Sequence, residues 1–380
     1  TEEVEGIVPE YLTLLHGVLD SPDIPLNVSR SYLQSDAQVK KISNHIVKKV
    51  ADRLDELFRN ERDLFESKWD SLKVFVQYGM LSDEKFYDRA VKFILLTDVA
   101  GKHFTLDEYR TLTESEQTDK DGSLIWLYAS DRDAQYAAIA RAESKGYSIL
   151  LMDGPLDVHA VSQLEQKLEK TRFVRVDSDT IDKLIAKSEV KAVELSEDEQ
   201  SALRTIFSAR LPKEEKRNYS VSLEALGADG DAVQVTQGEF MRRMQEMARL
   251  QPGMSFYGDL PEGYNVILNY EHPLLQRLLQ QEKSEVEPKL AELRASLAEE
   301  QAKIAAEEKA LEGQETKTSA ELDTLRAKKS ELEGQINSQL NAFGENTLLV
   351  GQLIDLALLS HGLLSGEALA AFIRRSQALL

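Results

Sequence analysis

The residues best suited to chemistry outside their own domain lie near the start of the sequence, in the segment Asp23–Gln34. Arg30 supplies a guanidinium there, and Asn27 and Gln34 supply carboxamides. A guanidinium stays charged and presents rigidly arranged donors, which suit phosphate or carboxylate oxygens. On residue types alone, an ordinary surface ion pair is the simpler interpretation of Arg30. The segment nevertheless predicts an exposed loop that offers polar groups to a partner.

Two features predict how this loop is held. Pro25 fixes an extended backbone ahead of Leu26. Ser35 and Asp36 then form a helix-start signal, and apolar residues follow at helical spacing, at Val39, Ile42, Ile46, Val50 and Leu54. We therefore expect a helix from Asp36 to Phe58 directly after the loop.

The loop resembles the catalytic loop in the middle domain of the heat-shock protein 90 chaperones, which carries the pattern Leu-Pro-Leu-Asn-Val-Ser-Arg-Glu-x-Leu-Gln. Ile24 takes the place of the first Leu and Ser31 that of the Glu. Other family motifs follow in order, at Ile7–Leu12, Gly17–Asp20, Asn44–Lys49, Leu106–Tyr109, Gln237–Met244, His272–Leu274 and Asp355–Leu359. The resemblance covers most of the chain outside roughly 283–343 and is closest to bacterial members of the family.

The resemblance implies roles for these residues. Arg30 would reach the γ-phosphate of ATP, bound with Mg²⁺ in an N-terminal ATPase domain of the same polypeptide, and Asn27 and Gln34 would order the loop. The chain would correspond to the later part of the middle domain (1–185, catalytic loop 23–35) and the C-terminal dimerisation domain (190–380). It carries neither a G-x-x-x-x-G-K-[ST] loop nor a G-x-G-x-x-G motif after a strand. Alone, it is expected to bind no nucleotide and to be inactive as an ATPase.

A second candidate surface is the methionine-rich segment after residue 239. Met241, Met244 and Met247 are spaced by three and are joined by Phe240. Flexible, polarizable methionine side chains suit surfaces that fit many partners. The resemblance implies a helix that contacts unfolded or partly folded client proteins. A buried core stripe is an equally good interpretation of the pattern.

Composition excludes several classes of function. The 380 residues carry a formal net charge of −20, which argues against nucleic-acid binding, since that depends on neutralising phosphates. There are no cysteines, and the six histidines never fall at metal-ligand spacing, so we expect no metal site. No apolar run is long enough to span a membrane. We expect no membrane partner and a cytoplasmic protein.

The expected fold class is α/β followed by α+β. After a helical segment, strands are predicted at Leu124–Tyr128, Tyr147–Met152 and Phe173–Val176 with helices between them. Strand–helix–strand units of this length indicate a small parallel sheet, here over 123–177. Ser130–Asp133 is expected to cap the first of these helices. Beyond a charged junction, Ser196 and Glu199 form a capping box, and strands are predicted at Tyr219–Leu223, Ala232–Val235 and Tyr264–Asn269.

The segment 283–343 lies outside the family pattern. Leu290, Leu297, Ile304 and Leu311 recur every seven residues, and Leu325, Leu332, Ile336 and Leu340 form a second seam. With a break at Gly313, this composition predicts an antiparallel coiled-coil hairpin. One continuous helix is the alternative; its roughly 60 residues would make a rod of about 90 Å, whose end would lie far from the domain it must rejoin. The segment serves either as a partner-binding arm or as a tolerated insertion.

The sequence closes with two apolar helices. Residues 347–359 are apolar on nearly every face, so this helix is expected to be buried all round. Together with a helix from Glu367 to Leu380 it would form a four-helix bundle with a second copy of the chain. The expected interface residues are Leu349, Leu353, Leu356, Leu359, Phe372 and Ile373. A hairpin packed only on its own domain is the alternative.

Taken together, these features predict part of an ATP-driven, homodimeric molecular chaperone that binds and remodels client proteins. The alternative from a different class is a structural coiled-coil scaffold or partner-binding module without ATP coupling. An autonomous hydrolase is disfavoured, because the sequence offers no nucleophile–base pair or metal constellation.

Overall fold

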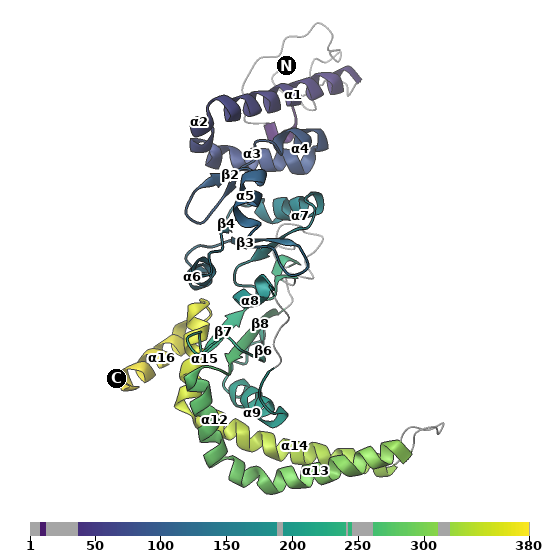
Figure 1. The fold of residues 1–380 in the computed structure, drawn as a ribbon, viewed down its shortest axis with the longest axis vertical. Coiled ribbons are helices and arrows are strands. Elements are labelled where there is room, and N and C mark those ends of the chain that lie inside the picture. The colour runs from purple at the N-terminus through teal and green to yellow at the C-terminus, as the bar shows by residue number, and fades with distance from the viewer. Residues whose placement is uncertain are drawn as a thin grey trace, which may run out of the picture. The chain divides into compact units, whose positions relative to one another are not determined.

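The computed structural model describes residues 8–12, 37–187, 193–240, 242–244, 261–310 and 320–379. The chain divides into two compact units. Unit 1 comprises Thr1–Ser188 and Arg243–Gly258, and unit 2 comprises Glu189–Arg242 and Asp259–Leu380. Figure 1 shows the elements of each unit along the chain.

Unit 1 begins with helices and continues as alternating strands and helices. Its elements are the 3-10 helix Glu10–Leu12, α1 (Ala37–Asn60), α2 (Arg62–Ser67), α3 (Trp69–Ser82), α4 (Glu84–Ala90), β1 (Leu96–Thr97), β2 (His103–Phe104), α5 (Leu106–Thr113), β3 (Leu124–Ala129), α6 (Tyr136–Ser144), β4 (Ile149–Leu151), α7 (Asp157–Lys167), β5 (Thr171–Arg175) and α8 (Ile181–Leu184). The predicted small parallel sheet is confirmed, with the strand order β4-β3-β5.

The sheet of unit 1 is covered on both faces. All six residues of β3 are buried. Trp126 and Tyr128 face the cluster that includes Val161 of α7, and Leu127 faces the cluster that includes Ile139 of α6. The two helices therefore lie on opposite sides of β3, which explains why the strand reads as a continuous apolar run rather than an alternating one.

Aromatic side chains fill the α7 side of this sheet. The Trp126 ring packs edge-on against Tyr109 and Phe173, each with 5.2 Å between ring centroids. Its indole Nε1 donates to the Thr113 hydroxyl over 3.0 Å, and this hydroxyl donates to the Tyr109 carbonyl. The only polar atom of the tryptophan ring is thereby satisfied within the core.

The cap of α6 differs from the prediction. The helix begins at Tyr136, and Ser130–Asp133 precedes it as a turn. The carboxamide oxygen of Gln135 accepts the backbone N–H groups of Ser130 and Asp131, over 2.8 and 3.0 Å. Gln135 thus closes the turn after β3, a contact that the cap signal in the sequence did not reveal.

Unit 2 combines a sheet with long helices. Its elements are α9 (Glu197–Ser208), β6 (Arg217–Glu224), β7 (Val233–Thr236), β8 (Glu262–Asn269), α12 (Pro273–Glu285), α13 (Glu287–Ala310), α14 (Ala320–Asn346), α15 (Leu348–Ser360) and α16 (Gly366–Leu379). The predicted capping box of Ser196 and Glu199 is present at the start of α9. The strand order is β6-β8-β7, with β6 parallel and β7 antiparallel to β8.

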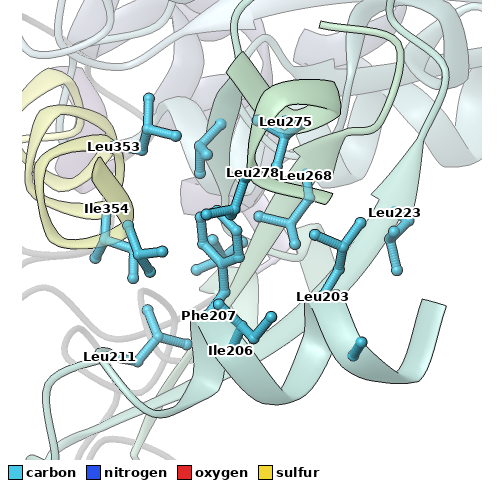
Figure 2. Close-up of a cluster of buried hydrophobic side chains, with 14 of the residues drawn as sticks. Leu203, Ile206, Phe207, Leu211, Leu223, Leu268, Leu275, Leu278, Leu353 and Ile354 are labelled. Atoms are coloured by element: carbon cyan, nitrogen blue, oxygen red, sulfur yellow. The ribbon is translucent and has the colours of Figure 1, made fainter. Parts of the chain in front are cut away.

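One core holds unit 2 together. Leu203, Ile206 and Phe207 of α9 gather with Leu268 of β8 and with residues of α12 and α15 (Figure 2). Leu353 and Ile354 approach this cluster from α15 (Figure 2). The last helices of the chain are therefore part of the core of the unit.

The segment between α12 and α15 forms two helices. Residues 311–319, including the predicted break at Gly313, lie outside the described residues. Side by side in Figure 1, α13 and α14 are joined by ion pairs from Glu300 to Lys328 and from Glu308 to Arg326, each 2.7 Å long. These pairs place later residues of α13 against earlier residues of α14, so the two helices run in opposite directions.

A glycine sets how closely α14 approaches α9. A Cβ atom on Gly344 would overlap the carbonyl oxygen of Ile206. Any other residue at 344 would push α14 away from α9, because the obstacle is backbone and not the end of a flexible side chain. The C-terminal end of α14 therefore packs directly against the backbone of α9 at Gly344.

Candidate functional site

The predicted catalytic-loop residues Asn27, Arg30 and Gln34 lie outside the described residues. The segment before the loop is firmly anchored in unit 1. Tyr11 is buried, packs on Phe86 with 5.2 Å between ring centroids, and donates from its hydroxyl to Asp83 over 3.4 Å. Burial, followed by the Asp83 carboxylate, raises the pKa of Tyr11 above its ordinary value. The hydroxyl therefore stays protonated and keeps its role as donor.

The segment after the loop is anchored as well. Helix α1 starts at Ala37, and its Val47 and Ala51 are buried in the cluster that contains Tyr11. The nearest described residues on both sequence sides of the loop, in the segment 8–12 and in α1, thus contribute to one core cluster of unit 1.

The methionine-rich segment is described in part. Residues 239, 240 and 242–244 are helical, whereas Met241 and Met247 lie outside the described residues. Phe240 is 72% exposed, and Met244 is half-buried. The core interpretation therefore does not apply to Phe240, and the exposure of the whole methionine set stays a prediction.

The next residue of this segment, Arg243, belongs to unit 1 and binds the sheet edge there. Its guanidinium lies 2.6 Å from the Glu165 carboxylate and also donates to the Phe173 carbonyl. Glu165 in turn accepts the backbone N–H of Phe173 over 2.6 Å. Sequence reasoning missed this cluster, because Glu165, Phe173 and Arg243 carry no local signal that links them.

The C-terminal helices divide the predicted interface residues into two sets. Leu353 and Phe372 are buried in the core of their own unit, and Leu349 packs against that core. Leu356, Leu359 and Ile373 are exposed, the first by 54% and the last by 47%. In the single chain this helix is therefore not buried on every side, and the expected burial against a second copy stays a prediction. Uniform apolarity hid the fact that α15 has one core-facing side and one free side.

Leu348 belongs with the exposed set, although it was not among the predicted interface residues. It is 59% exposed at the start of α15. It shares a helix face with Leu359, because eleven residues complete just over three full turns. This spacing is the signal that could have identified it.

Polar contacts fix how α16 packs on α15. The Gln352 amide donates to the Ser376 hydroxyl over 2.7 Å, and Arg375 pairs with Asp355. These two contacts leave Leu356 and Ile373 exposed on the pair. The arrangement is that of two helices with apolar side chains still available for a further partner.

Among the described residues, no group of three or more His, Asp or Glu side chains could hold a metal ion. No single helix in the described part of the chain has the length and apolarity to cross a membrane. Helices α14 and α15 meet that test only as a pair, with a bend of 73° between them.

Comparison with known proteins places the chain in a family. Residues 1–333 match the family model described as Hsp90 protein. The chain is 61% identical over 387 residues to the chaperone protein HtpG of Porphyromonas gingivalis strain W83, and 51% identical over 385 residues to that of Bacteroides fragilis strain 638R. Both alignments cover all of this chain and 56% of the relative, so the chain spans about half the length of these relatives.

A more distant relative, the chaperone protein HtpG of Mycobacterium avium strain 104, is 28% identical over 300 residues, or 76% of this chain and 44% of the relative. The alignments to the Porphyromonas and Bacteroides proteins include the region of α13 and α14, since they extend over the whole chain. The order of motifs in the sequence and the match of the family model agree, and the chain belongs to the heat-shock protein 90 family of chaperones.

Proposed function

We propose that this chain is part of an ATP-driven, homodimeric chaperone clamp that binds and remodels client proteins. Unit 1 corresponds to the later part of the middle domain and unit 2 to the C-terminal dimerisation domain. The observation that carries the proposal is the exposed apolar side of α15 and α16 in a member of a chaperone family. A cytoplasmic setting and an ATPase domain preceding this segment belong to the same proposal.

The dimer interface is the part of the proposal that the described residues support most directly. Leu348, Leu356, Leu359 and Ile373 expose apolar area on helices that bury other apolar residues, among them Val350, Leu353, Ile354, Leu358 and Phe372. Burying a leucine or isoleucine contributes about 1.5–3 kcal/mol, and a two-fold interface counts each residue twice. A second copy of the same pair of helices completes a four-helix bundle and covers these residues.

Light scattering over a range of concentrations tests the interface. Leu356→Glu together with Ile373→Glu should weaken dimerisation by at least about 10²-fold, because the charges would have to be buried without partners. Deleting α15 is a poorer test, because Val350, Leu353 and Ile354 belong to the core of the unit. Leu112→Glu on α5 is the matched control, since Leu112 is also about half exposed. An undiminished dimer in the double variant would rule out this interface.

We extend the proposal to the catalytic loop. In the full-length protein, Arg30 stabilises charge on the γ-phosphate of ATP held by the ATPase domain, with Asn27 and Gln34 ordering the loop. Losing one such donor costs about 10²-fold or more in turnover. Arg30→Ala should therefore lower the ATPase rate severely and leave ATP affinity almost unchanged, as measured by steady-state turnover and nucleotide titration. Arg30→Lys, which keeps the charge but loses the planar donors, should recover little. Wild-type turnover in Arg30→Ala would remove the role.

The methionine-rich helix supplies the client contact in this proposal. Phe240 is exposed and Met244 is half-buried, and the adaptable side chains of methionine suit contact with many clients. Met244→Glu with Met247→Glu should weaken the holding of an unfolded client while the thermal transition is retained. Loss of the transition would show instead that these methionines are core residues.

The α13–α14 pair is proposed to be an antiparallel coiled-coil hairpin. Glu300 supports this, because it is almost fully buried between Lys303 and Lys328 at the position that continues the seam of Val286 and Leu293. A buried polar residue in a seam favours one register over others. The hairpin alone also fits a structural scaffold, but such a scaffold has no need of the exposed residues of α15 and α16.

A further inference from the structure

The outer edge of β6 differs from the other strand edges in the described part of the chain. The β6–β8 ladder is bracketed by bonds from Glu262 N–H to the Lys216 carbonyl and from Tyr270 N–H to the Glu224 carbonyl, over 2.9 and 3.2 Å. In a parallel ladder, alternate residues direct both backbone groups to the partner strand. Even-numbered residues of β6 therefore bond to β8, and odd-numbered residues direct their N–H and C=O groups away from the sheet.

The outward groups belong to Tyr219, Val221 and Leu223, together with Arg217 at the start of the strand. No backbone or side chain among the described residues bonds to them. Their side chains are not the free part, since Tyr219, Val221 and Leu223 pack on the core of unit 2. What the edge offers is a row of backbone donors and acceptors at a spacing of two residues.

Other edges in the described structure are occupied or short. On β5, Phe173 directs its N–H to Glu165 and its carbonyl to Arg243. On β4, the Ile149 carbonyl accepts the N–H of Val99. Strand β7 is only four residues long, and all four are buried. An eight-residue edge without such cover is one that proteins usually avoid, because it pairs readily with another chain.

The sequence of β6 does nothing to prevent such pairing. Between Arg217 and Glu224 the strand reads Asn-Tyr-Ser-Val-Ser-Leu, with no charge and no proline. Charged residues and proline are the devices that normally block an edge. They are confined here to the two ends of the strand, which limits the length that a partner can add.

A groove lies beside the start of this edge. It has a volume of about 510 Å³ and is walled by Leu211, Pro212 and Tyr219, with Lys213 and Glu215 among its lining residues. A strand added to β6 would place one alternate side chain at this groove. Backbone bonds and a side-chain pocket together are the features of recognition by strand addition.

We propose that the outer edge of β6 binds extended segments of unfolded client polypeptides by adding them as a fourth strand. The inference rests on the proposed chaperone function and names the chemistry that the edge recognises. An unfolded client carries unpaired backbone groups at the same two-residue spacing, whereas a folded protein has its own backbone paired.

Residue-level hydrogen exchange on the whole chain tests the edge, with reduced, carboxymethylated α-lactalbumin as a permanently unfolded probe. In the free chain, the outward amides of Tyr219 and Val221 should exchange fast and the inward amides of Ser220 and Ser222 slowly. Added probe should slow the outward amides by about tenfold or more and leave the inward ones unchanged. The inward amides are a control within the same strand.

A variant checks the same point by affinity. Val221→Pro removes an outward N–H without removing a bond to β8, and it should weaken probe binding by about tenfold. Val221→Thr keeps the shape and the N–H group and should bind as the wild type does. Circular dichroism establishes that the proline variant is folded. If it is not, the exchange pattern of the wild-type chain decides.

Two results would overturn the proposal. If the chain holds the probe while the outward amides keep their free exchange rates, clients bind elsewhere and the chaperone function stands without this edge. If the outward amides of the free chain become protected as its concentration rises, a second copy occupies the edge. Failure to hold the probe at all would contradict the proposed function itself.

Discussion

The two larger sheets in the described part of the molecule are both three-stranded, but they differ in whether the outer edges of their strands are hydrogen-bonded. In unit 1 the central strand β3 is buried on both faces, and the strands beside it bond to other groups along their outer edges. In unit 2, β6 packs one side on the core and presents the row Asn218, Ser220 and Ser222 on the other, with its outer edge unpaired. The first sheet is closed along its edges, whereas the second keeps one strand edge without a partner among the described residues.

The largest expected effect comes from breaking the scaffold core. Trp126→Ala removes two ring contacts and the donor to Thr113, so it should destabilise unit 1 by about 3–5 kcal/mol. Denaturant unfolding measures this loss. Because unit 2 has its own core, the slow amide exchange of β8 should persist under conditions that unfold unit 1. Simultaneous loss of both would show that the two units unfold as one.

A smaller effect should follow when an occupied edge is opened. Glu165→Ala removes the acceptor of the Phe173 N–H and the partner of Arg243, which should cost unit 1 about 2 kcal/mol. The Phe173 amide should then exchange faster, as the amides of Tyr219 and Val221 are expected to do. Glu165→Gln keeps an acceptor oxygen and is the control. Unchanged exchange in Glu165→Ala would mean that the carboxylate does not protect this edge.

The smallest effect is a contrast in pH dependence between the units. In unit 1, the hydrogen bond from Arg62 lowers the pKa of Glu108 to about 2. In unit 2, burial raises the pKa of Glu282, to which the carboxylates of Glu287 and Glu199 add, while Arg294 and Lys283 oppose. The Glu108 carboxylate therefore stabilises unit 1 at pH values above its ordinary pKa of 4.5, and this contribution is lost as the pH falls toward 2. Glu282, in contrast, contributes to the stability of unit 2 at pH values below 4.5, and this contribution is lost as the pH rises through the raised pKa of the folded state.

Melting curves from pH 3 to 8 test the contrast. Glu108→Gln should lower stability at pH 7 by less than about 1 kcal/mol, because the pair is partly exposed, and the difference should fade in acid. Glu282→Gln should raise stability at pH 7 by about 1 kcal/mol and lose the gain near pH 4. Glu292→Gln, at an exposed position of α13, is the control and should leave the stability unchanged both at pH 7 and in acid. If Glu108→Gln and Glu282→Gln changed the stability in the same direction at pH 7, the opposite pKa shifts assigned to the two carboxyl groups would be contradicted.

Local patterns in the sequence predicted local structure well. The spacing of Val39 to Leu54 gave α1, the box of Ser196 and Glu199 gave the start of α9, and the apolar run after Leu124 gave β3. Each depends on residues within a few turns of one another. The parallel pairing of β6 with β8 joins residues more than forty apart and has no such signature.

The candidate sites show the same limit. Sequence motifs proposed the loop of Arg30 and the segment of Met244 as sites, because the family pattern includes them, and both stay predictions. They could not separate Leu353 from Leu356, since an apolar helix without a polar face has no period that distinguishes its core side from its free side. The cluster of Glu165 and Arg243 depends on tertiary contact alone.

The close contact at Gly344 is one of several that fix one end of α14, since Ile336, Leu340 and Phe343 of this helix are buried in the core of unit 2. From Ile336 to Ala320 the helix extends 16 residues, or about 24 Å. A tilt of about ten degrees where the helix leaves the core would therefore displace the far end by about 4 Å. A small change in the packing around Ile336 would thus move the far end of α14 by almost the spacing between two neighbouring strands.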